Sequence, residues 1–463
     1  MNLTDKQYNR FLDLVFNYLS KRDLCACSLV NKTWSQRAMS KLWYQPEFDN
    51  GDLTSFQSFQ NFFKILTKIA SEQTKTLIQI IDINQVKESL YETLNDNWLT
   101  LIIQHCPNLR SLIIRDSSCL TPMTIRKLIT NFKSTHNSLQ YLNLENSKNI
   151  TENLLKSFIQ KFPELLAINL NNCSGVSDSS ISQISYICHD LNTIELSNSS
   201  SRITDVSFYA ISKFGKNKLR KLNFSSMPKF TDNSIKSISN HCKNLEVVNF
   251  SSCQLITSIG LANLLMANKN TLKELWIHNM KGIPWLTKDL WELITIKCSK
   301  LELLSINFNT ITSSSNCSSS FTVDLILYYF SQFKKLKKLV LYNTSEESSS
   351  KFLQNLIESF GMGDNKSTHS IKSNKIILEE ILIYRMRYEC DFILGGYAET
   401  KNSMESYGIE KKDVINDEWL AYVKTIELSQ TQLKIEKIEV EPSEIFILPS
   451  NLTQLLSQTQ LKN

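Results

Sequence analysis

One pattern of apolar positions, L-x-x-L-x-L, recurs along most of the chain, with Leu, Ile, Val or Phe at its three apolar places. The regular copies lie 26 to 30 residues apart and begin at Leu109, Leu139, Leu165, Leu191, Leu219, Leu245, Leu272 and Leu301. The last two apolar residues of a copy are two positions apart, so they point to one side of a strand. Each copy therefore predicts a short strand. A period of this length is typical of a solenoid of stacked strand-and-helix units.

The residues after each strand predict a helix. Ser177-Asp178, Thr204-Asp205 and Thr231-Asp232 follow polar turns in three successive repeats. A Ser or Thr there can cap the first free N–H groups of a helix, and the Asp suits the positive end of the helix dipole. Apolar residues then recur at helical spacing, as in residues 181–188. These side chains are expected to pack onto the strand leucines.

The repeat pattern is regular from about Ile78 to Ile306 and then loosens. The next copies begin at Leu336 and Leu378, after steps of 35 and 42 residues. We therefore expect repeats over residues 76–400, irregular after about residue 310. Residues 401–463 fit no repeat well and are expected to form a C-terminal cap or tail, because a solenoid needs a cap at its end.

The N-terminal residues 8–43 break the period and predict compact helices. Phe11, Leu14, Val15 and Tyr18 form one stripe at helical spacing. Three helices in about 40 residues make a poor self-contained core. The apolar side chains that such a core cannot bury indicate a surface for a partner.

A run of phenylalanines separates these helices from the first repeat. Its apolar residues are Phe56, Phe59, Phe62, Phe63, Leu66 and Ile69. This spacing predicts a linker helix within residues 49–75, packing the N-terminal helices against the first repeat.

The composition changes this picture little. The chain has 463 residues, 42% hydrophobic and 21% charged, which is ordinary for a soluble protein. Its net charge of +6 is modest, and the densest cluster, residues 334–338, lies at the start of a predicted strand, so nucleic-acid binding is not expected. No apolar run approaches the roughly 18 residues of a spanning helix, and residues 1–5 lack a secretion signal. We expect no membrane association and a cytoplasmic or nuclear location.

Six of the eleven cysteines obey the repeat period. Cys106, Cys188, Cys242 and Cys298 each precede the first leucine of a copy by three residues, and Cys173 and Cys253 each follow one by eight. Such a register is typical of small buried residues. Corresponding cysteines two repeats apart would be separated by roughly 10 Å, too far to share a zinc ion. We expect free thiols and no metal site.

No catalytic motif stands out. The sequence contains no H-E-x-x-H, no G-x-S-x-G and no G-K-[ST] phosphate loop. We therefore expect a protein that is not an enzyme and that needs no cofactor.

The repeats resemble the cysteine-containing class of leucine-rich repeats, in which C-x-x-L-x-x-L-x-L is followed by Cys and then Ile-Thr-Asp. The N-terminal residues 1–48 resemble an F-box through the matches Val15–Leu19, Asp23-Leu24, Leu29-Val30, Trp34 and Leu42-Trp43. The family's initial Leu-Pro is absent. These resemblances imply an α/β solenoid, with parallel strands on its concave face and helices on its convex face, preceded by a small all-α F-box. The alternative for the N-terminal helices is a simple cap of the solenoid.

F-box proteins with such repeats are similar to substrate receptors of SCF-type cullin-RING ubiquitin ligases. The resemblance implies that the F-box binds a Skp-type adaptor, and through it a cullin scaffold, while the repeats bind a target protein. The receptor is non-catalytic and acts by holding the target near the ubiquitin carrier. The implied adaptor-binding residues are Phe11, Leu14, Val15, Phe16, Leu19, Leu24, Leu29, Val30 and Trp34. The alternative is a repeat scaffold that binds partners without any ligase.

The target site can be predicted only from geometry. Residues between the inward leucines should face outward, and in the N-terminal half these are small and polar, as at Asn143 and Asn169. The C-terminal half adds aromatic residues, namely Trp276, His278, Tyr342 and Tyr384. Exposed aromatic side chains are frequent binding anchors, so we expect the target to dock there. The alternative for Trp276 is packing beneath a loop, for example against Trp285.

Overall fold

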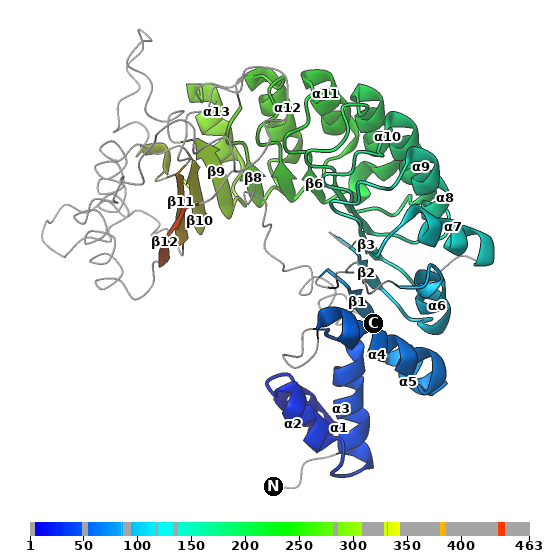
Figure 1. Cartoon of the computed structure of the whole chain (residues 1–463). Coiled ribbons are helices and arrows are strands. Elements are labelled where there is room, and N and C mark those ends of the chain that lie inside the picture. The colour runs from blue at the N-terminus through cyan, green and yellow to red at the C-terminus, as the bar shows by residue number, and fades with distance from the viewer. Residues whose placement is uncertain are drawn as a thin grey trace, which may run out of the picture. The chain divides into compact units, whose positions relative to one another are not determined.

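The computed structural model describes two compact units (Figure 1). The residues described are 5–48, 54–84, 86, 94–115, 119–132, 138–280, 286–307, 328–330, 332–342, 380–385 and 434–439. For residues 5–7 and the last two segments only the backbone is described. Unit 1 comprises Met1–Leu272 with Met280–Gly282, and unit 2 comprises Lys273–Asn279 with Ile283–Asn463. Within the described part, none of the helices is long and apolar enough to cross a bilayer.

Unit 1 begins with three helices, α1 (Asp5–Phe16), α2 (Lys21–Cys27) and α3 (Lys32–Tyr44). Polar side chains set where they start: Ser20 caps α2 by accepting from the Asp23 N–H, and Asn31 caps α3 by accepting from the Trp34 N–H at 2.9 Å. The small core of this three-helix domain contains Leu12, Phe16, Leu24 and Ala38. Few side chains fit inside it, as expected for so short a segment.

Helices α4 (Ser55–Lys68) and α5 (Glu72–Leu77) join the three-helix domain to the first repeat. The Phe59 ring lies 5.0 Å from that of Phe48 and 6.0 Å from that of Trp98, centroid to centroid. Trp98 belongs to the first helix of the repeats, so Phe59 contacts both that helix and the segment that follows α3. The separate helix α5 follows because Ser71 caps a new start. The Gln79 N–H also donates to the Tyr44 carbonyl at 3.0 Å, directly before the first strand.

The repeats of unit 1 form a parallel sheet with one helix per strand (Figure 1). Its strands are β1 (Ile80–Asp82), β2 (Ser111–Ile113), β3 (Tyr141–Asn143), β4 (Ala167–Asn169), β5 (Thr193–Glu195), β6 (Lys221–Asn223) and β7 (Val247–Asn249). The strands pair in register, so their central apolar residues form one row that continues from Ile81 to Val248. This confirms the strands that the apolar pattern predicted.

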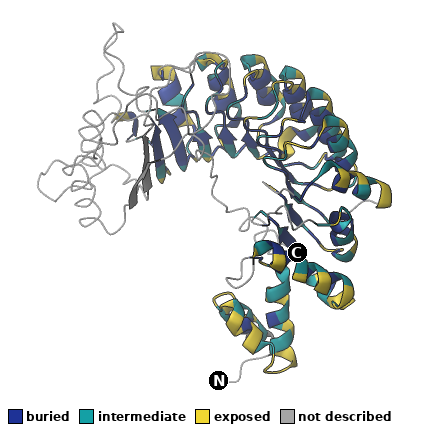
Figure 2. Cartoon of the chain, viewed as in Figure 1, coloured by how far each residue is buried: buried dark blue, intermediate teal, exposed yellow. Residues whose placement is uncertain are grey.

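The repeat helices of unit 1 lie on the outer side of the strands (Figure 1). They are α6 (Trp98–His105), α7 (Pro122–Asn131), α8 (Glu152–Ile159), α9 (Asp178–Ile187), α10 (Asp205–Gly215), α11 (Asp232–His241) and α12 (Ser258–Asn268). The predicted caps Ser177, Thr204 and Thr231 each precede a helix and accept a hydrogen bond from its first turn. The core between helices and strands is buried throughout (Figure 2).

Unit 2 continues the same construction with wider spacing. It contains β8 (Glu274–Trp276), α13 (Lys288–Glu292), a π-helical turn at Leu293–Lys297, β9 (Leu303–Asn307), β10 (Lys338–Tyr342), β11 (Glu380–Arg385) and β12 (Lys434–Glu439). Strands β8 to β12 pair in parallel and in register. The strands predicted at Leu339 and Ile381 are therefore confirmed. Strand β12 lies in the segment expected to be a cap, so the sheet extends into that segment.

The chain leaves strands β3 to β8 through a residue in the left-handed region. These residues are Asn146, Asn172, Asn198, Ser226, Ser252 and Asn279, each seven positions after the first leucine of its copy, with φ between 48° and 60°. Asn tolerates this conformation better than most residues because its short side chain can hydrogen-bond locally. The repeat period thus extends to backbone conformation as well as to apolar side chains.

The periodic cysteines are buried, as predicted, and they also join successive repeats. The Cys173 thiol donates to the Leu144 carbonyl at 3.0 Å, and the Cys253 thiol donates to the Phe224 carbonyl at 2.9 Å. Ser199 occupies the corresponding place in its repeat and donates to the Leu170 carbonyl at 2.7 Å. Cys and Ser at this position thus make the same contact to the preceding repeat. Among the described residues, no three His, Cys, Asp or Glu side chains group as metal ligands would.

Burial should make these periodic thiols unreactive, while Cys25 on α2 is exposed. Burial raises the pKa of Cys106, Cys173, Cys188, Cys242 and Cys253 to about 12, and only thiolates react rapidly. Iodoacetamide at pH 8 should therefore modify Cys25 in the native protein and leave these five untouched. Peptide mass spectrometry measures each site, with protein in guanidinium as the control. Native modification of any of the five as fast as Cys25 would contradict their burial.

A second set of contacts between repeats uses the aspartates at the helix starts. The Thr204 hydroxyl donates to Asp178 Oδ2 at 2.6 Å, Thr231 donates to Asp205 Oδ1 at 2.9 Å, and Thr257 donates to Asp232 Oδ2 at 2.6 Å. Each threonine is also the N-cap of its own helix. We call these three pairs the Asp–Thr ladder. The sequence indicated the cap and the dipole role, but not that each Asp accepts from the next repeat.

Stability should depend on the charge of Asp178. Burial alone would raise the pKa of Asp178, but hydrogen bonds from Ser207 and Thr204 together lower it below its ordinary value. Its contribution is therefore present above the unfolded-state pKa of about 3.9 and is lost as pH falls through the lower folded-state pKa. Asp178→Ala should lower the free energy of unfolding at pH 7 by about 1–2 kcal/mol. Urea unfolding of the wild-type and Asp178→Ala proteins from pH 7 to pH 3 measures this difference in the free energy of unfolding. A difference that does not change with pH would contradict the prediction.

Candidate protein-binding surfaces

The three-helix domain carries two groups of exposed apolar side chains. Phe11 and Leu14 on α1 and Tyr18, two residues after its end, have exposed fractions of 53%, 56% and 88%. Leu29 and Val30 lie in the turn between α2 and α3, with exposed fractions of 86% and 58%. We call these five residues the apolar patch. Figure 2 shows much of the surface of α1 and α2 as exposed. Apolar residues gathered in this way are typical of a surface that binds another protein.

Backbone hydrogen bonds fix the turn that carries Leu29 and Val30. The Leu29 N–H donates to the Ala26 carbonyl at 3.1 Å, and the Val30 N–H donates to the Cys27 carbonyl at 3.2 Å. The Asn31 cap then starts α3 at once. The two side chains are therefore held outward by the end of α2 and the start of α3, which lowers the entropy lost on binding.

Polar contacts hold α1 against α3. Arg37 on α3 forms an ion pair with Asp13 at 2.6 Å, and Lys41 donates to the Asn17 side chain at 2.6 Å. Trp34 adds an indole N–H bond of 2.8 Å to the Tyr8 hydroxyl. These contacts position the α1 stripe relative to the turn before α3.

Three residues predicted to bind the adaptor are half-buried. Val15, Leu19 and Trp34 pack against the domain core, and the Trp34 ring meets the Phe16 ring edge to face at 5.5 Å. Their remaining exposed surface can contribute to binding, but their substitution would also disturb the domain. Their role in adaptor binding stays a prediction.

Phe16 and Leu24 are corrections to the predicted adaptor-binding set. Phe16 is 2% exposed and Leu24 is 6% exposed, because both side chains fill the core between the three helices. They stabilise the domain and cannot contact a partner directly. Tyr18 is the most exposed member of the apolar patch, although the sequence did not predict it as an adaptor-binding residue. Its i, i+7 spacing from Phe11 could have indicated that the two side chains share one face.

The strand face of unit 1 carries a row of polar residues at the position predicted to face outward. Asn143, Asn169, Glu195, Asn223 and Asn249 align across neighbouring strands and are all buried. Each asparagine accepts from the backbone N–H two residues later; for Asn169 the distance to the Asn171 nitrogen is 2.9 Å. These side chains therefore hydrogen-bond the backbone of the turn that follows each strand. These positions were predicted to face outward, and their side chains are nonetheless buried.

Glu195 is the one carboxylate in this row. Burial raises its pKa above the ordinary value, while Lys221 and the Asn171 side chain act in the opposite direction. The Asn171 amide lies 3.4 Å from Glu195 Oε2. The carboxylate thus has a polar neighbour in the turn that follows the preceding strand, β4.

The aromatic residues predicted to bind the target lie on the strand face of unit 2. His278 is 5% exposed and Tyr342 is similarly buried, and their rings stack with centroids 3.6 Å apart. His278 Nδ1 also lies 3.0 Å from Ser305 Oγ. Burial lowers the pKa of His278 to about 3, so the ring is neutral at physiological pH. The predicted exposure of these two residues is wrong, because they pack against each other.

Trp276 is half-buried and packs against a cluster of Leu303, Val340 and Tyr342. Its indole nitrogen is buried and has no acceptor among the described residues. Trp285, the neighbour proposed for it, lies outside the described residues. The Tyr384 side chain is also outside them, although its backbone pairs with Tyr342 in β10. Target binding by Trp276 and Tyr384 stays a prediction.

Comparisons with known proteins found similarities for the N-terminal domain and for about half of the chain. A family model described as F-box-like matches residues 11–49. Antagonist of mitotic exit network protein 1 from Saccharomyces cerevisiae is 25% identical over 264 residues, covering 56% of this chain and 44% of that protein. The protein of the same name from Candida glabrata is 24% identical over 249 residues, covering 52% of this chain and 44% of that protein. This chain thus spans less than half the length of these relatives.

A solved structure has a similar fold over most of the chain. In the crystal structure of the Rad7 and Elc1 complex in yeast, one chain aligns with a TM-score of 0.51 and 15% identity. The alignment covers 87% of this chain and 94% of that chain. Together with the strand-and-helix repeats, these similarities show an F-box-like domain at residues 11–49 that precedes a solenoid with the fold of the Rad7 chain.

Proposed function

We propose that the protein is the substrate-recognition subunit of an SCF-type ubiquitin ligase. In this proposal the F-box-like domain binds a Skp-type adaptor, the adaptor binds a cullin scaffold, and the repeats bind a target protein. The protein performs no bond chemistry. It raises the effective concentration of target lysines near the ubiquitin carrier. We place this activity in the cytoplasm, the nucleus or both.

The apolar patch carries the proposal. The domain core needs Leu12, Phe16, Leu24 and Ala38, and it leaves the patch to solvent. Five exposed apolar side chains on so short a domain cost solubility, and burying them against a partner would remove that cost. The patch therefore suits an adaptor with a complementary apolar surface.

The comparisons support the adaptor as partner. The segment matched as F-box-like spans residues 11–49, which includes the whole patch. The structural neighbour was solved as a complex of Rad7 with Elc1. By analogy, the three-helix domain of this chain would be the part that joins it to a ligase assembly.

The absence of the family's Leu-Pro dipeptide bears on the affinity for the adaptor. In the family that dipeptide helps to dock the adaptor, and no Leu-Pro precedes Tyr8 here. Tyr8 in the first turn of α1 and Tyr18 just after its last turn are both exposed and can supply apolar area. We propose that these tyrosines compensate for the missing dipeptide.

The proposal is tested by co-purification of the full chain with a Skp-type adaptor. We expect a one-to-one complex on size-exclusion chromatography, which then recruits a cullin and its RING subunit. A well-folded chain that elutes without the adaptor would overturn the ligase function. The protein would then be a repeat scaffold, and its partners should be sought on the repeats alone.

A further inference from the structure

Helices α9 and α10 are neighbours on the outer side of unit 1 (Figure 1), and each carries an exposed tyrosine. Tyr186 on α9 is 69% exposed, and Tyr209 on α10 is 48% exposed. Each ring meets a ring of the following helix edge to face: Tyr186 meets Phe214 at 5.7 Å, and Tyr209 meets His241 at 6.2 Å. An edge-to-face contact uses at most one face of a ring, so both tyrosines keep aromatic surface open to solvent.

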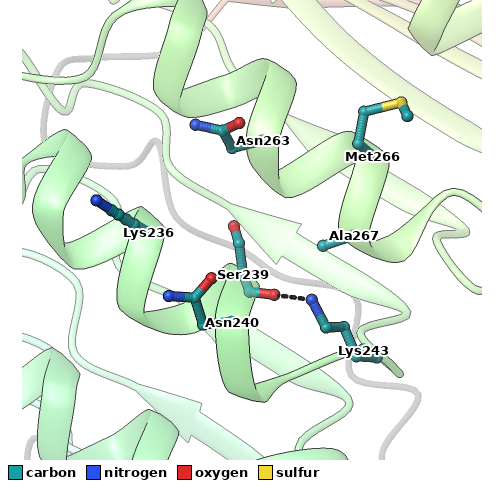
Figure 3. Close-up of a pocket in the computed structure, with 7 residues that line it drawn as sticks. All are labelled: Lys236, Ser239, Asn240, Lys243, Asn263, Met266 and Ala267. Carbon is teal, nitrogen blue, oxygen red and sulfur yellow. Dashed lines mark hydrogen bonds between the residues drawn. The ribbon is translucent and has the colours of Figure 1, made fainter.

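The same helices carry cations and, beyond their first residues, no carboxylate. After the first residue of each helix, α9 to α12 contain Lys213 and Lys236 but no Asp or Glu. The Lys213 ammonium lies 5.5 Å from the centroid of the Tyr209 ring. Figure 3 shows Lys236, Asn240 and Lys243 on the α11 side of a groove beside α12. The rings are therefore surrounded by positive charge.

The turns after α9, α10 and α11 add to this charge. The two carboxylates there are already paired, Asp190 with Lys218 and Glu246 with Arg220 at 3.9 Å. The other lysines of α10, α11 and the turns that follow them are exposed and form no ion pair with a described residue; these are Lys213, Lys216, Lys236 and Lys243. The helix dipole accounts for lysines near a helix end but not for Lys236, which lies in the middle of α11.

We propose that this face of α9 to α11 binds single-stranded nucleic acid. Every base has a flat face that can stack on an exposed tyrosine ring, and the phosphates between bases are attracted by the lysines. No unpaired carboxylate on this face repels the phosphates. In a duplex the bases stack on each other, so a duplex can use the lysines but not the rings. An acidic peptide can also use the lysines, but it brings no base to stack.

The sequence did not predict this partner, because the expectation that nucleic acid is not bound rested on the densest run of cations, residues 334–338. The four lysines named above lie between residues 213 and 243, and no two of them are adjacent in sequence. Stacking of α10 against α11 brings them onto one face. This inference goes beyond the proposed function and does not depend on it, because α9 to α11 belong to the repeats.

The proposal is tested by fluorescence anisotropy with the full-length protein and labelled probes. The probes are single-stranded oligo(U) and oligo(dT) of about 20 nucleotides, which exceeds the site of a typical single-strand-binding fold, a duplex of equal length, and polyglutamate of equal charge. We expect both single strands to bind at least about tenfold more tightly than the duplex and polyglutamate. A preference between the two strands would identify RNA or DNA as the ligand. Equal binding of the duplex or of polyglutamate, or no binding of either strand at about 50 mM salt, would overturn the proposal.

Variants separate stacking from charge. Tyr186→Ala should weaken binding of the single strands about fivefold or more, as expected for one stacked base, whereas Tyr186→Phe should bind like the wild type. Lys236→Ala should reduce the slope of log affinity against log salt concentration by about 0.7, as expected for one lost phosphate contact with a single strand. Wild-type affinity in Tyr186→Ala, with an unchanged circular dichroism spectrum, would overturn the stacking and with it the proposal.

The matched control is Tyr328→Ala in unit 2. Tyr328 is 53% exposed, and its ring lies 5.6 Å from that of Tyr329. Burial and the nearby carboxylates of Glu292 and Asp289 raise the pKa of Tyr329, so this exposed ring lies near negative charge. Tyr328→Ala should therefore bind the single strands like the wild type. An equal loss in Tyr328→Ala and Tyr186→Ala would show that exposed rings bind bases wherever they lie, which contradicts a site on α9 to α11.

Discussion

Replacing Phe11 and Leu29 together by alanine should weaken adaptor binding by about 100-fold or more, because two interface anchors of roughly 2 kcal/mol each would be lost. Both side chains are exposed and are absent from the three-helix core. The melting temperature of the isolated protein should therefore change little. Isothermal titration calorimetry with a purified Skp-type adaptor measures the affinity, and circular dichroism measures the melting.

The matched control is Tyr186→Ala/Ile259→Ala, which removes two equally exposed apolar side chains from the repeat helices. This pair should leave adaptor affinity unchanged. A wild-type affinity in the Phe11→Ala/Leu29→Ala protein would exclude the apolar patch as the adaptor surface. A loss in both double variants would indicate nonspecific apolar adhesion.

Phe230→Ala should lower the free energy of unfolding by about 3–5 kcal/mol, the range for removing a buried ring. The Phe230 side chain is fully buried, and its ring lies 4.5 Å from that of Phe208 and 4.7 Å from that of Phe250. These rings belong to neighbouring repeats, so the variant opens a cavity that weakens the contacts between units. Urea unfolding followed by circular dichroism measures the change.

Phe230→Leu is the control for this loss, because it keeps most of the apolar volume and should cost less than about 1.5 kcal/mol. Hydrogen exchange adds a spatial readout. Each repeat of a solenoid contacts only its neighbours, so protection should fall around α10 to α12 and persist in the three-helix domain. A change in the free energy of unfolding below 1 kcal/mol for Phe230→Ala would contradict this packing.

Much of the repeat architecture could be predicted from the sequence because the apolar period is long and regular. The strands of unit 1, the caps Ser177, Thr204 and Thr231, and the burial of the periodic cysteines all follow from residues within one repeat. The contacts between repeats could not be predicted in this way. The Asp–Thr ladder and the row from Asn143 to Asn249 depend on which side chains stacking brings together.

The candidate site was predicted less completely for a related reason. In α1, Phe11 and Phe16 are both apolar and lie near each other in sequence, and only the position of α3 decides which one is buried. His278 and Tyr342 are 64 residues apart, so the stacking that buries them could not be read from either repeat. In short helices and in widely spaced strands, the neighbouring elements decide whether a side chain is exposed.

The Asp–Thr ladder has the same polarity at every step: each repeat presents an aspartate to the following unit and a threonine to the preceding one. A copy of one unit inserted between Asp178 and Thr204 would therefore find a matching acceptor at one boundary and a matching donor at the other. Duplication or loss of a whole unit leaves no unmatched polar group at the junction. The array can thus change its length in evolution by single genetic events, and its reach toward a partner can change without a redesign of the core.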